Sequence, residues 1–187
     1  LAQLASQLAA IHRVEFVGTG FELLPAYIPR FIHQRDSVYP DASLDAVRIR
    51  DTLSSTWPPR PKNGPALLHG DYWPGNVLWK NGELVGIVDW EESCIGDPIA
   101  DLAIARLDLF WAFGADAMRE FTELYASASG FDLGDLPYWD LDAALRPVFN
   151  LHEWAAPWPG LDRPDITEAT MRADHRRFVS LAFDALI

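Results

Sequence analysis

A tight turn between two β-prone runs is the feature that most constrains the fold of this chain. The runs VLWK (77–80) and ELVGIVDW (83–90) are joined by Asn81-Gly82. This pair favours a type I′ turn because both of its residues readily take positive φ. A two-residue turn also fixes how the flanking strands pair. The sequence therefore predicts a short antiparallel hairpin over residues 77–90.

Three oxygen-bearing side chains are expected to meet at the open end of this hairpin. Counted back from the turn, Asn76 lies opposite Ile87, and Asp89 shares that face because side chains alternate with a period of two. The offset from Asn76 to Asp89 is then about 7 Å. Asp71 precedes Asn76 by five residues, and the intervening Pro-Gly pair bends the chain back toward the same end. We therefore expect Asp71, Asn76 and Asp89 to converge.

Segments with a helical spacing of apolar residues surround the hairpin. The expected helices cover residues 1–14, 44–53, 97–113, 115–129, 137–156 and 165–186. Gly114 separates two of these segments, and Pro147 should kink or break another. Asp165 and Glu168 have the spacing of a capping box at the start of the last helix. Helices thus dominate the predicted structure.

These patterns predict a mainly α fold with a small β-hairpin (α+β) in a single domain over residues 1–187. Residues 1–64 form a helical lead-in that ends in a proline-rich loop, WPPRPKNGP (57–65). Residues 65–93 carry the loop and hairpin, and residues 94–187 form a helical subdomain. The linker-like stretch late in the chain is too short to divide it into separate domains.

Composition excludes several functional classes. The chain is 49% hydrophobic, which is enough for a packed core, and its net charge is −12, from 27 acidic against 15 basic residues. Such a field repels nucleic acids and anionic membranes and attracts cationic solutes. No apolar run is long enough to span a bilayer. We therefore expect neither a nucleic-acid partner nor a membrane partner.

Cysteine usage suggests the compartment. Cys94 is the single cysteine and cannot form an internal disulfide, and the chain has no Asn-X-Ser/Thr site. Both features favour a reducing, cytoplasmic environment over secretion. Cys94 itself is interpreted as a small buried hydrophobe.

The predicted cluster of carboxylate and amide oxygens has the chemistry of a Mg²⁺ site. Mg²⁺, or Mn²⁺ in its place, is held by few protein oxygens and is usually completed by waters and substrate phosphates. A site of this kind indicates phosphoryl transfer.

The string around these residues resembles a known family. HGDYWPGN (69–76) matches the H-x-D-x-x-x-x-N catalytic loop of kinases, and DWE (89–91) stands where kinases have Asp-Phe-Gly. With IGDPIADLA (95–103), the whole is similar to the aminoglycoside phosphotransferase and choline kinase group of small-molecule kinases. The resemblance implies the helical C-terminal lobe of a protein-kinase-like fold, with ATP or GTP as co-substrate. It also implies that Asp71 is the catalytic base, and that Asn76 and Asp89 hold Mg²⁺ or Mn²⁺.

Neighbouring residues are assigned supporting roles. The resemblance makes His69 a packing residue that braces the loop, and Asp101 the aspartate that hydrogen-bonds the catalytic-loop backbone. Asp97, followed by proline, is read as a helix cap. Glu91 either faces Asp89 or belongs to a solvated acidic segment, and the sequence leaves both readings open.

Several parts of a complete kinase are not found in this sequence. It has no G-x-G-x-x-G loop and no strand-lysine pattern, and the only Lys or Arg between Gly64 and Ala105 is Lys80, against seven acids. The opening helix resembles the first helix after the kinase hinge. We therefore expect a truncated or proteolysed chain, rather than a natural remnant, that lacks its N-terminal nucleotide-binding lobe and is inactive by itself.

The acceptor is less constrained than the reaction. The resemblance places it against the helices after the metal aspartate. The candidate pocket residues are Glu91, Trp139, Asp140, Glu153, Trp154 and Trp158. Aromatic and acidic groups together suit a cationic or amino-sugar substrate, but they could equally be core aromatics and a solvated acidic surface. Aminoglycoside-like antibiotics, choline-like amino alcohols, sugars and homoserine-like alcohols all remain open.

Two other functions compete with a small-molecule kinase. One is a non-catalytic, kinase-like binding module or remnant without the nucleotide lobe, which an upstream coding sequence would distinguish. The other is a Mg²⁺-dependent phosphohydrolase, which would use similar ligands but would lack the combined His-Gly-Asp and Asp-Trp-Glu order.

Overall fold

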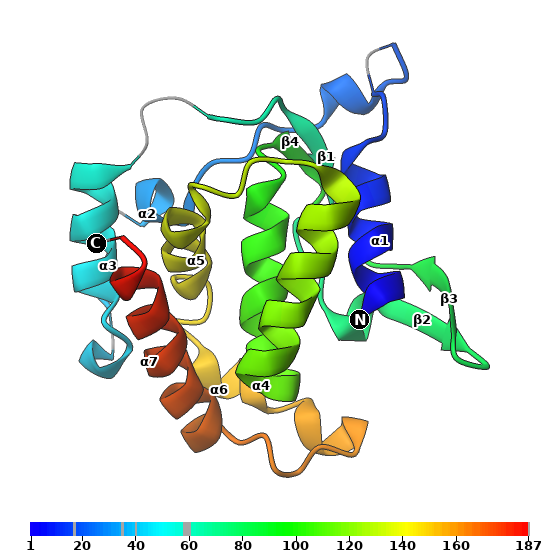
Figure 1. Cartoon of the computed structure of the whole chain (residues 1–187). Coiled ribbons are helices and arrows are strands. Elements are labelled where there is room, and N and C mark those ends of the chain that lie inside the picture. The colour runs from blue at the N-terminus through cyan, green and yellow to red at the C-terminus, as the bar shows by residue number, and fades with distance from the viewer. Residues whose placement is uncertain (17, 35, 40, 58–60, 187) are drawn as a thin grey trace.

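The computed structural model describes residues 1–16, 18–34, 36–39, 41–57 and 61–186, and it is mainly helical with two small antiparallel sheets (Figure 1). The α-helices are α1 (Ala2–His12), α2 (Arg30–His33), α3 (Ala46–Thr56), α4 (Ile99–Ser129), α5 (Leu136–Ala144), α6 (Leu151–Ala155) and α7 (Glu168–Asp184). Short 3₁₀ helices cover Phe21–Leu23, Ala42–Leu44, Pro74–Asn76 and Trp158–Leu161. The strands are β1 (Ala66–Leu68), β2 (Val77–Lys80), β3 (Glu83–Ile87) and β4 (Cys94–Gly96). Residues 58–60 of the predicted proline-rich loop lie outside the described residues.

Helix breaks fall where glycine and proline predict them. Gly114 interrupts α4 with φ 84° and ψ −178°, a conformation that only glycine adopts without strain. Pro147 lies in the gap between α5 and α6, so the predicted break of that segment is confirmed. The predicted capping box is wrong by two residues: the Thr167 hydroxyl accepts from the Thr170 backbone N–H, and the Thr170 hydroxyl accepts from that of Thr167, because a threonine hydroxyl can serve as the acceptor at both positions of the box.

The β2–β3 hairpin forms as predicted, but its register shifts. Lys80 pairs with Glu83, whereas Val77 pairs with Ile87. One extra residue on β3 therefore bulges between the turn and the open end, which moves Asn76 one position from its predicted partner. The backbone N–H of Val88, rather than Ile87, lies against Asn76 and donates to its carbonyl oxygen at 3.0 Å. The predicted pairing of Asn76 with Ile87 is wrong for this reason.

A second sheet, which the sequence did not predict, holds the loop before the hairpin. Strand β1 pairs with β4 antiparallel, with Leu67 opposite Ile95. Because β1 runs directly into residues 69–71 and β4 runs into α4, this pairing fixes where the loop meets that helix. Cys94, in β4, is buried as predicted.

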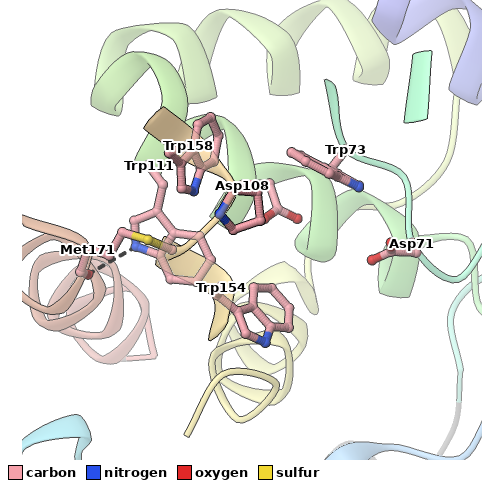
Figure 2. A pocket seen from close by; sticks show the side chains of 8 residues that line it. Asp71, Trp73, Asp108, Trp111, Trp154, Trp158 and Met171 are labelled. Carbon is pink, nitrogen blue, oxygen red and sulfur yellow. Dashed lines mark hydrogen bonds between the residues drawn. The ribbon is translucent and has the colours of Figure 1, made fainter. Parts of the chain in front are cut away.

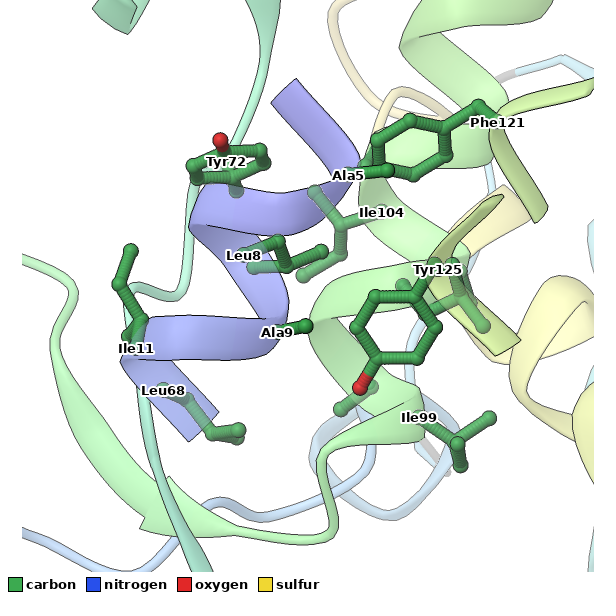
Figure 3. Packing of buried hydrophobic residues seen from close by; sticks show 14 of the residues in the cluster. Ala5, Leu8, Ala9, Ile11, Leu68, Tyr72, Ile99, Ile104, Phe121 and Tyr125 are labelled. Atoms are coloured by element: carbon green, nitrogen blue, oxygen red, sulfur yellow. The ribbon is translucent and has the colours of Figure 1, made fainter. Parts of the chain in front are cut away.

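The core around the loop is built by α1 packing on α4 (Figure 3). Leu8 and Ala9 of α1 meet Ile104 and Tyr125 of α4, and all four are almost completely buried. Gln3 ties α1 to the hairpin, since its side-chain amide donates to Gly82 O and accepts from Leu84 N. A second cluster joins α3, α5, α6 and α7 to the middle of α4. In the part of the chain that is described, no helix has the length and apolarity to cross a bilayer.

Candidate active site

Asp101 anchors the loop between β1 and the hairpin. It lies in the first turn of α4 and is fully buried. Its carboxylate accepts from the backbone N–H groups of His69 at 2.6 Å and Gly70 at 2.9 Å. A third contact comes from His12 Nε2 at 3.2 Å. The predicted contact between Asp101 and the loop backbone is present in the structure.

His69 is fully occupied by structural contacts. Its Nε2 lies 2.9 Å from the carbonyl oxygen of Val88, which can only accept, so this nitrogen carries the proton. Its Nδ1 accepts from the backbone N–H of Asp71 at 3.3 Å. Gly70 is required beside it, because φ is 83° and an added Cβ would lie 2.2 Å from Glu92 O. His69 therefore contacts the backbone on both sides of the loop, in agreement with the predicted packing role.

Asp71 is held at both carboxylate oxygens. Oδ2 accepts from Asn76 Nδ2 at 3.1 Å, and Oδ1 accepts from Arg146 Nη2 at 2.6 Å. Asn76 also donates to the Asp71 backbone carbonyl at 3.0 Å. The side chain of Asp71 is 27% exposed, so it remains reachable. The sequence analysis predicted almost no cationic side chain at this site. That prediction is wrong, because Arg146, which follows α5, reaches Asp71.

Asp89 lies just past the end of β3 with φ 66° and is exposed. Glu91 turns toward it: a hydrogen bond to Asp89 raises the pKa of Glu91 above its usual value, and Asp89's charge adds to the rise. This contact favours the interpretation in which Glu91 faces Asp89 over the one in which it belongs to a solvated acidic segment. Among the described residues, no group of three His, Cys, Asp or Glu side chains could hold a metal ion.

The oxygen donors nevertheless fit Mg²⁺. Asn76 uses Nδ2 toward Asp71, and its Oδ1 makes no hydrogen bond with any residue that the structure describes. The Val88–Asn76 backbone bond brings the residue before Asp89 against Asn76. One amide oxygen and one or two carboxylates match a metal that retains waters and binds phosphates.

A pocket of about 180 Å³ opens beside Asp71. Its lining is Asp71, Trp73, Asp108, Trp111, Trp154, Pro157, Trp158 and Met171. The four tryptophans form two edge-to-face pairs, one between Trp73 and Trp158 and one between Trp111 and Trp154. Figure 2 shows Asp108 among these rings and Asp71 at one side of the pocket. We call this group of residues the tryptophan pocket.

Asp108 is the exceptional polar group of the tryptophan pocket. It is 5% exposed and accepts no hydrogen bond from any described residue. Burial raises its pKa to about 7, a rise that the charge of Arg146 opposes and that of Asp71 reinforces. A buried carboxylate without a donor is unfavourable unless a cation or a ligand compensates it.

Only two of the six predicted pocket residues line the tryptophan pocket, and Glu91 lies beside Asp89 instead. Trp154 and Trp158 line the tryptophan pocket. Trp139 instead packs on Tyr27 and Trp57. The remaining two acids also lie elsewhere: Asp140 pairs with Arg106, while the exposed Glu153 accepts from Asn150.

Sequence reasoning missed Asp108 and Arg146. A signal existed for Asp108, because it follows Asp101 by seven residues and so lies two turns further along the same helix face. No comparable signal existed for Arg146, which reaches Asp71 across 75 positions. Trp73, Trp111 and Met171 were also not assigned to the pocket.

Comparison with known proteins gives both a family and a fold. The model of the phosphotransferase enzyme family matches residues 1–145. A homoserine kinase of Phenylobacterium zucineum is 31% identical over 153 residues, which cover 74% of this chain and 46% of that protein.

Two solved structures share the fold. Spectinomycin phosphotransferase, in complex with ADP and spectinomycin, has a TM-score of 0.60 at 17% identity, and the match covers 99% of this chain and 64% of that one. Macrolide 2′-phosphotransferase type I has a TM-score of 0.57 at 24% identity, with 95% and 57% covered. These likenesses confirm the predicted kinase-like fold. The chain spans less than half the length of the homoserine kinase and under two thirds of each structure.

Proposed function

Because the chain belongs to the phosphotransferase enzyme family, we propose that it forms the catalytic lobe of a small-molecule kinase, which transfers the terminal phosphoryl group of ATP or GTP to a hydroxyl group. The observation that carries the proposal is the position of Asp71, which lines the tryptophan pocket and is held by Asn76 and Arg146. A carboxylate fixed at the mouth of a pocket can orient a hydroxyl there and accept its proton.

Each residue of the loop has a role in this reaction. Asp71 orients the acceptor hydroxyl, and Asn76 and Asp89 hold Mg²⁺ or Mn²⁺. The metal supplies neutralisation of charge on the transferred phosphoryl group. His69 and Asp101 keep the loop in shape through their backbone contacts. Catalysis of this kind depends chiefly on positioning and charge stabilisation, which a rigid loop supports.

The acceptor we propose is an alcohol that carries an amine. Arg146 compensates the charge of Asp71, while Asp108 has no hydrogen-bond donor among the described residues. An ammonium group would balance the Asp108 carboxylate and would lie against tryptophan faces, which attract cations. The volume of about 180 Å³ is below the roughly 300–1,000 Å³ usual for drug-sized ligands. It suits a small amino alcohol or one amino-bearing part of a larger molecule.

The nucleotide requires a further lobe in this proposal. The sequence has no glycine-rich phosphate loop, and Arg146 is committed to Asp71. We propose that a preceding nucleotide-binding lobe covers the triphosphate, and that the 187-residue chain alone transfers phosphate negligibly. Loss of such a cover removes both positioning and charge stabilisation.

A panel of acceptors tests the proposal. The chain, joined in one polypeptide to a preceding nucleotide-binding lobe, is incubated with ATP and with pairs of alcohols that differ only in an amine. We expect phosphorylated product from the amino alcohols, little from their amine-free partners, and none from the chain alone. Nucleotide binding without transfer to any acceptor would instead favour the non-catalytic binding module.

A further inference from the structure

Arg146 is a buried cation whose contacts differ from those of a structural ion pair. It lies two positions after the end of α5, and its side chain is 7% exposed. Among the described residues it donates one hydrogen bond, from Nη2 to Asp71 Oδ1 at 2.6 Å. Its guanidinium carbon lies 5.2 Å from the centre of the Trp154 ring. Nη1 is buried and has no hydrogen-bond partner in the described part of the chain.

Arg106 and Asp140 provide the contrasting case in the same lobe. Their ion pair is similarly buried, with side-chain exposures of 12% and 6%. Arg106 Nε and Nη2 bind the two oxygens of Asp140 at 2.9 and 2.8 Å, and Nη1 donates to Thr122. This two-pronged geometry uses the planar guanidinium fully, as expected where the pair serves only the fold.

Arg146 does not bind Asp71 in this two-pronged way. By binding only Oδ1, it leaves Oδ2 to Asn76. Two donors that are 70 positions apart in the sequence therefore fix the plane of one carboxylate, which also lines the tryptophan pocket. An arginine that leaves a buried nitrogen without a partner is poorly placed for stability alone. Its arrangement instead holds the Asp71 carboxylate in one orientation toward the pocket shown in Figure 2.

We propose that Arg146 is a positioning residue for phosphoryl transfer, acting through Asp71 by fixing the orientation of its carboxylate and compensating its charge. The proposal rests on the proposed kinase function, and it assigns Arg146 no direct contact with the nucleotide or metal. Asp71 without Arg146 is still tied to Asn76 but is free to turn about that single contact. Small misplacements of a catalytic group lower the turnover more than the binding of substrates.

The test is a double-mutant cycle in the polypeptide that includes the nucleotide-binding lobe. We expect Arg146→Gln to lower kcat about 10–100-fold with little change in the KM for ATP. Arg146→Lys, which keeps the charge and one donor, should recover part of the loss. In an Asp71→Asn background, followed by single-turnover measurements, Arg146→Gln should change the residual rate less than twofold, because the carboxylate it positions is gone.

Arg106→Gln is the matched control, since it removes a similarly buried arginine from an ion pair away from the tryptophan pocket. Thermal unfolding of every variant reports loss of fold separately from loss of turnover. Unchanged kcat in Arg146→Gln would overturn the proposal, as would an equal loss of kcat in Arg106→Gln at matched stability. A further loss in the Asp71→Asn background would also overturn it. If Arg146→Gln does not fold, Arg146→Lys decides: kcat equal to the wild type overturns the proposal. Wild-type turnover in Asp71→Asn alone would instead refute the proposed kinase function.

Discussion

The two halves of the candidate site, the loop with its hairpin and the tryptophan pocket, differ in how completely their polar groups are hydrogen-bonded by the protein. In the loop and hairpin, both nitrogens of His69 and both carboxylate oxygens of Asp71 have protein partners. In the tryptophan pocket, Asp108 accepts no hydrogen bond from a described residue. Because buried polar groups are normally paired, the first half is a finished scaffold. The second half contains a carboxylate that no described residue donates to.

Another buried aspartate sharpens this contrast. Asp142 accepts from the Phe31 backbone N–H at 3.0 Å and from Tyr27 Oη at 3.1 Å. Burial raises its pKa to about 6, and these donors oppose the rise. Asp108 has no such donors, and its pKa rises to about 7. Asp142 therefore ties α5 to residues 27–31, whereas Asp108 lines the tryptophan pocket.

The largest expected effect lies in the finished half. Asp71→Asn keeps the shape of the side chain but loses the carboxylate that orients the hydroxyl. We expect kcat to fall by about 10³-fold and nucleotide affinity to change little, as measured by steady-state transfer to the best amino alcohol. Asp116→Asn, on the exposed face of α4, is the control. Normal turnover in Asp71→Asn would remove the base role.

Asp101→Ala tests whether the loop is a scaffold held by one carboxylate. The change leaves the backbone N–H groups of His69 and Gly70 buried without an acceptor, together with His12 Nε2. We expect the free energy of unfolding of the isolated chain to fall by about 4 kcal/mol, measured by urea denaturation. A loss below about 1 kcal/mol would mean that other contacts hold the loop.

Asp108→Asn should instead raise the free energy of unfolding. The folded pKa of about 7 lies above an unfolded value of about 3.9, so ionisation of Asp108 opposes folding. That penalty is absent below about pH 4, grows as pH rises to 7, and is complete above it. We expect the variant to be more stable than the wild type at pH 8 by on the order of 3 kcal/mol, with no difference near pH 4.

The groups that face Asp108 are Arg146 and Asp71, and neither changes in this variant. Asp142→Asn is the comparison, because its new amide NH₂ would face a donor from Tyr27 or Phe31. Its gain at pH 8 should therefore be smaller. Equal gains in the two variants would break the distinction between a structural and a pocket carboxylate.

What could be predicted from the sequence follows the same division. The loop and hairpin are local: Asp71, Asn76 and Asp89 lie within nineteen residues, so turn chemistry and spacing bring them together. Even there the register was wrong, because a bulge on β3 depends on packing rather than on the turn. Local signals also gave the breaks at Gly114 and Pro147.

The tryptophan pocket is non-local and was only partly predicted. Its walls come from the loop, from α4, from α6, from the 3₁₀ segment at Trp158 and from α7. Residue type alone predicted Trp139 and Trp154 equally, yet α5 directs Trp139 onto Tyr27 and Trp57. Asp140 was misplaced for the same reason, since Arg106 on α4 takes its charge. Helix packing decides which face each residue occupies, and no single segment encodes it.

Metal binding tests whether the loop and hairpin hold a divalent cation at Asn76 and Asp89. Asp89→Asn tolerates the positive φ at this position but removes the charge of a proposed oxygen ligand. We expect the isolated chain to bind Mn²⁺ weakly and the variant to bind it about tenfold more weakly, or about 1.4 kcal/mol. Paramagnetic broadening of signals near Asn76 is the readout. Broadening centred on another acidic segment, or unchanged in the variant, would refute this assignment.

The smallest expected effect probes one wall of the pocket. Trp158 and Trp139 are similarly buried, at 7% and 8% exposure, but only Trp158 lines the tryptophan pocket. Phenylalanine attracts cations less strongly than tryptophan, and one such contact is worth about 0.5–1 kcal/mol. We therefore expect Trp158→Phe to raise the KM for an amino alcohol about threefold and to leave the KM of an amine-free alcohol unchanged. Trp139→Phe, which alters the core near Tyr27 and Trp57, should change stability but not the ratio of the two KM values. A shift in that ratio for Trp139→Phe, without one for Trp158→Phe, would transfer acceptor recognition to the region around Trp139.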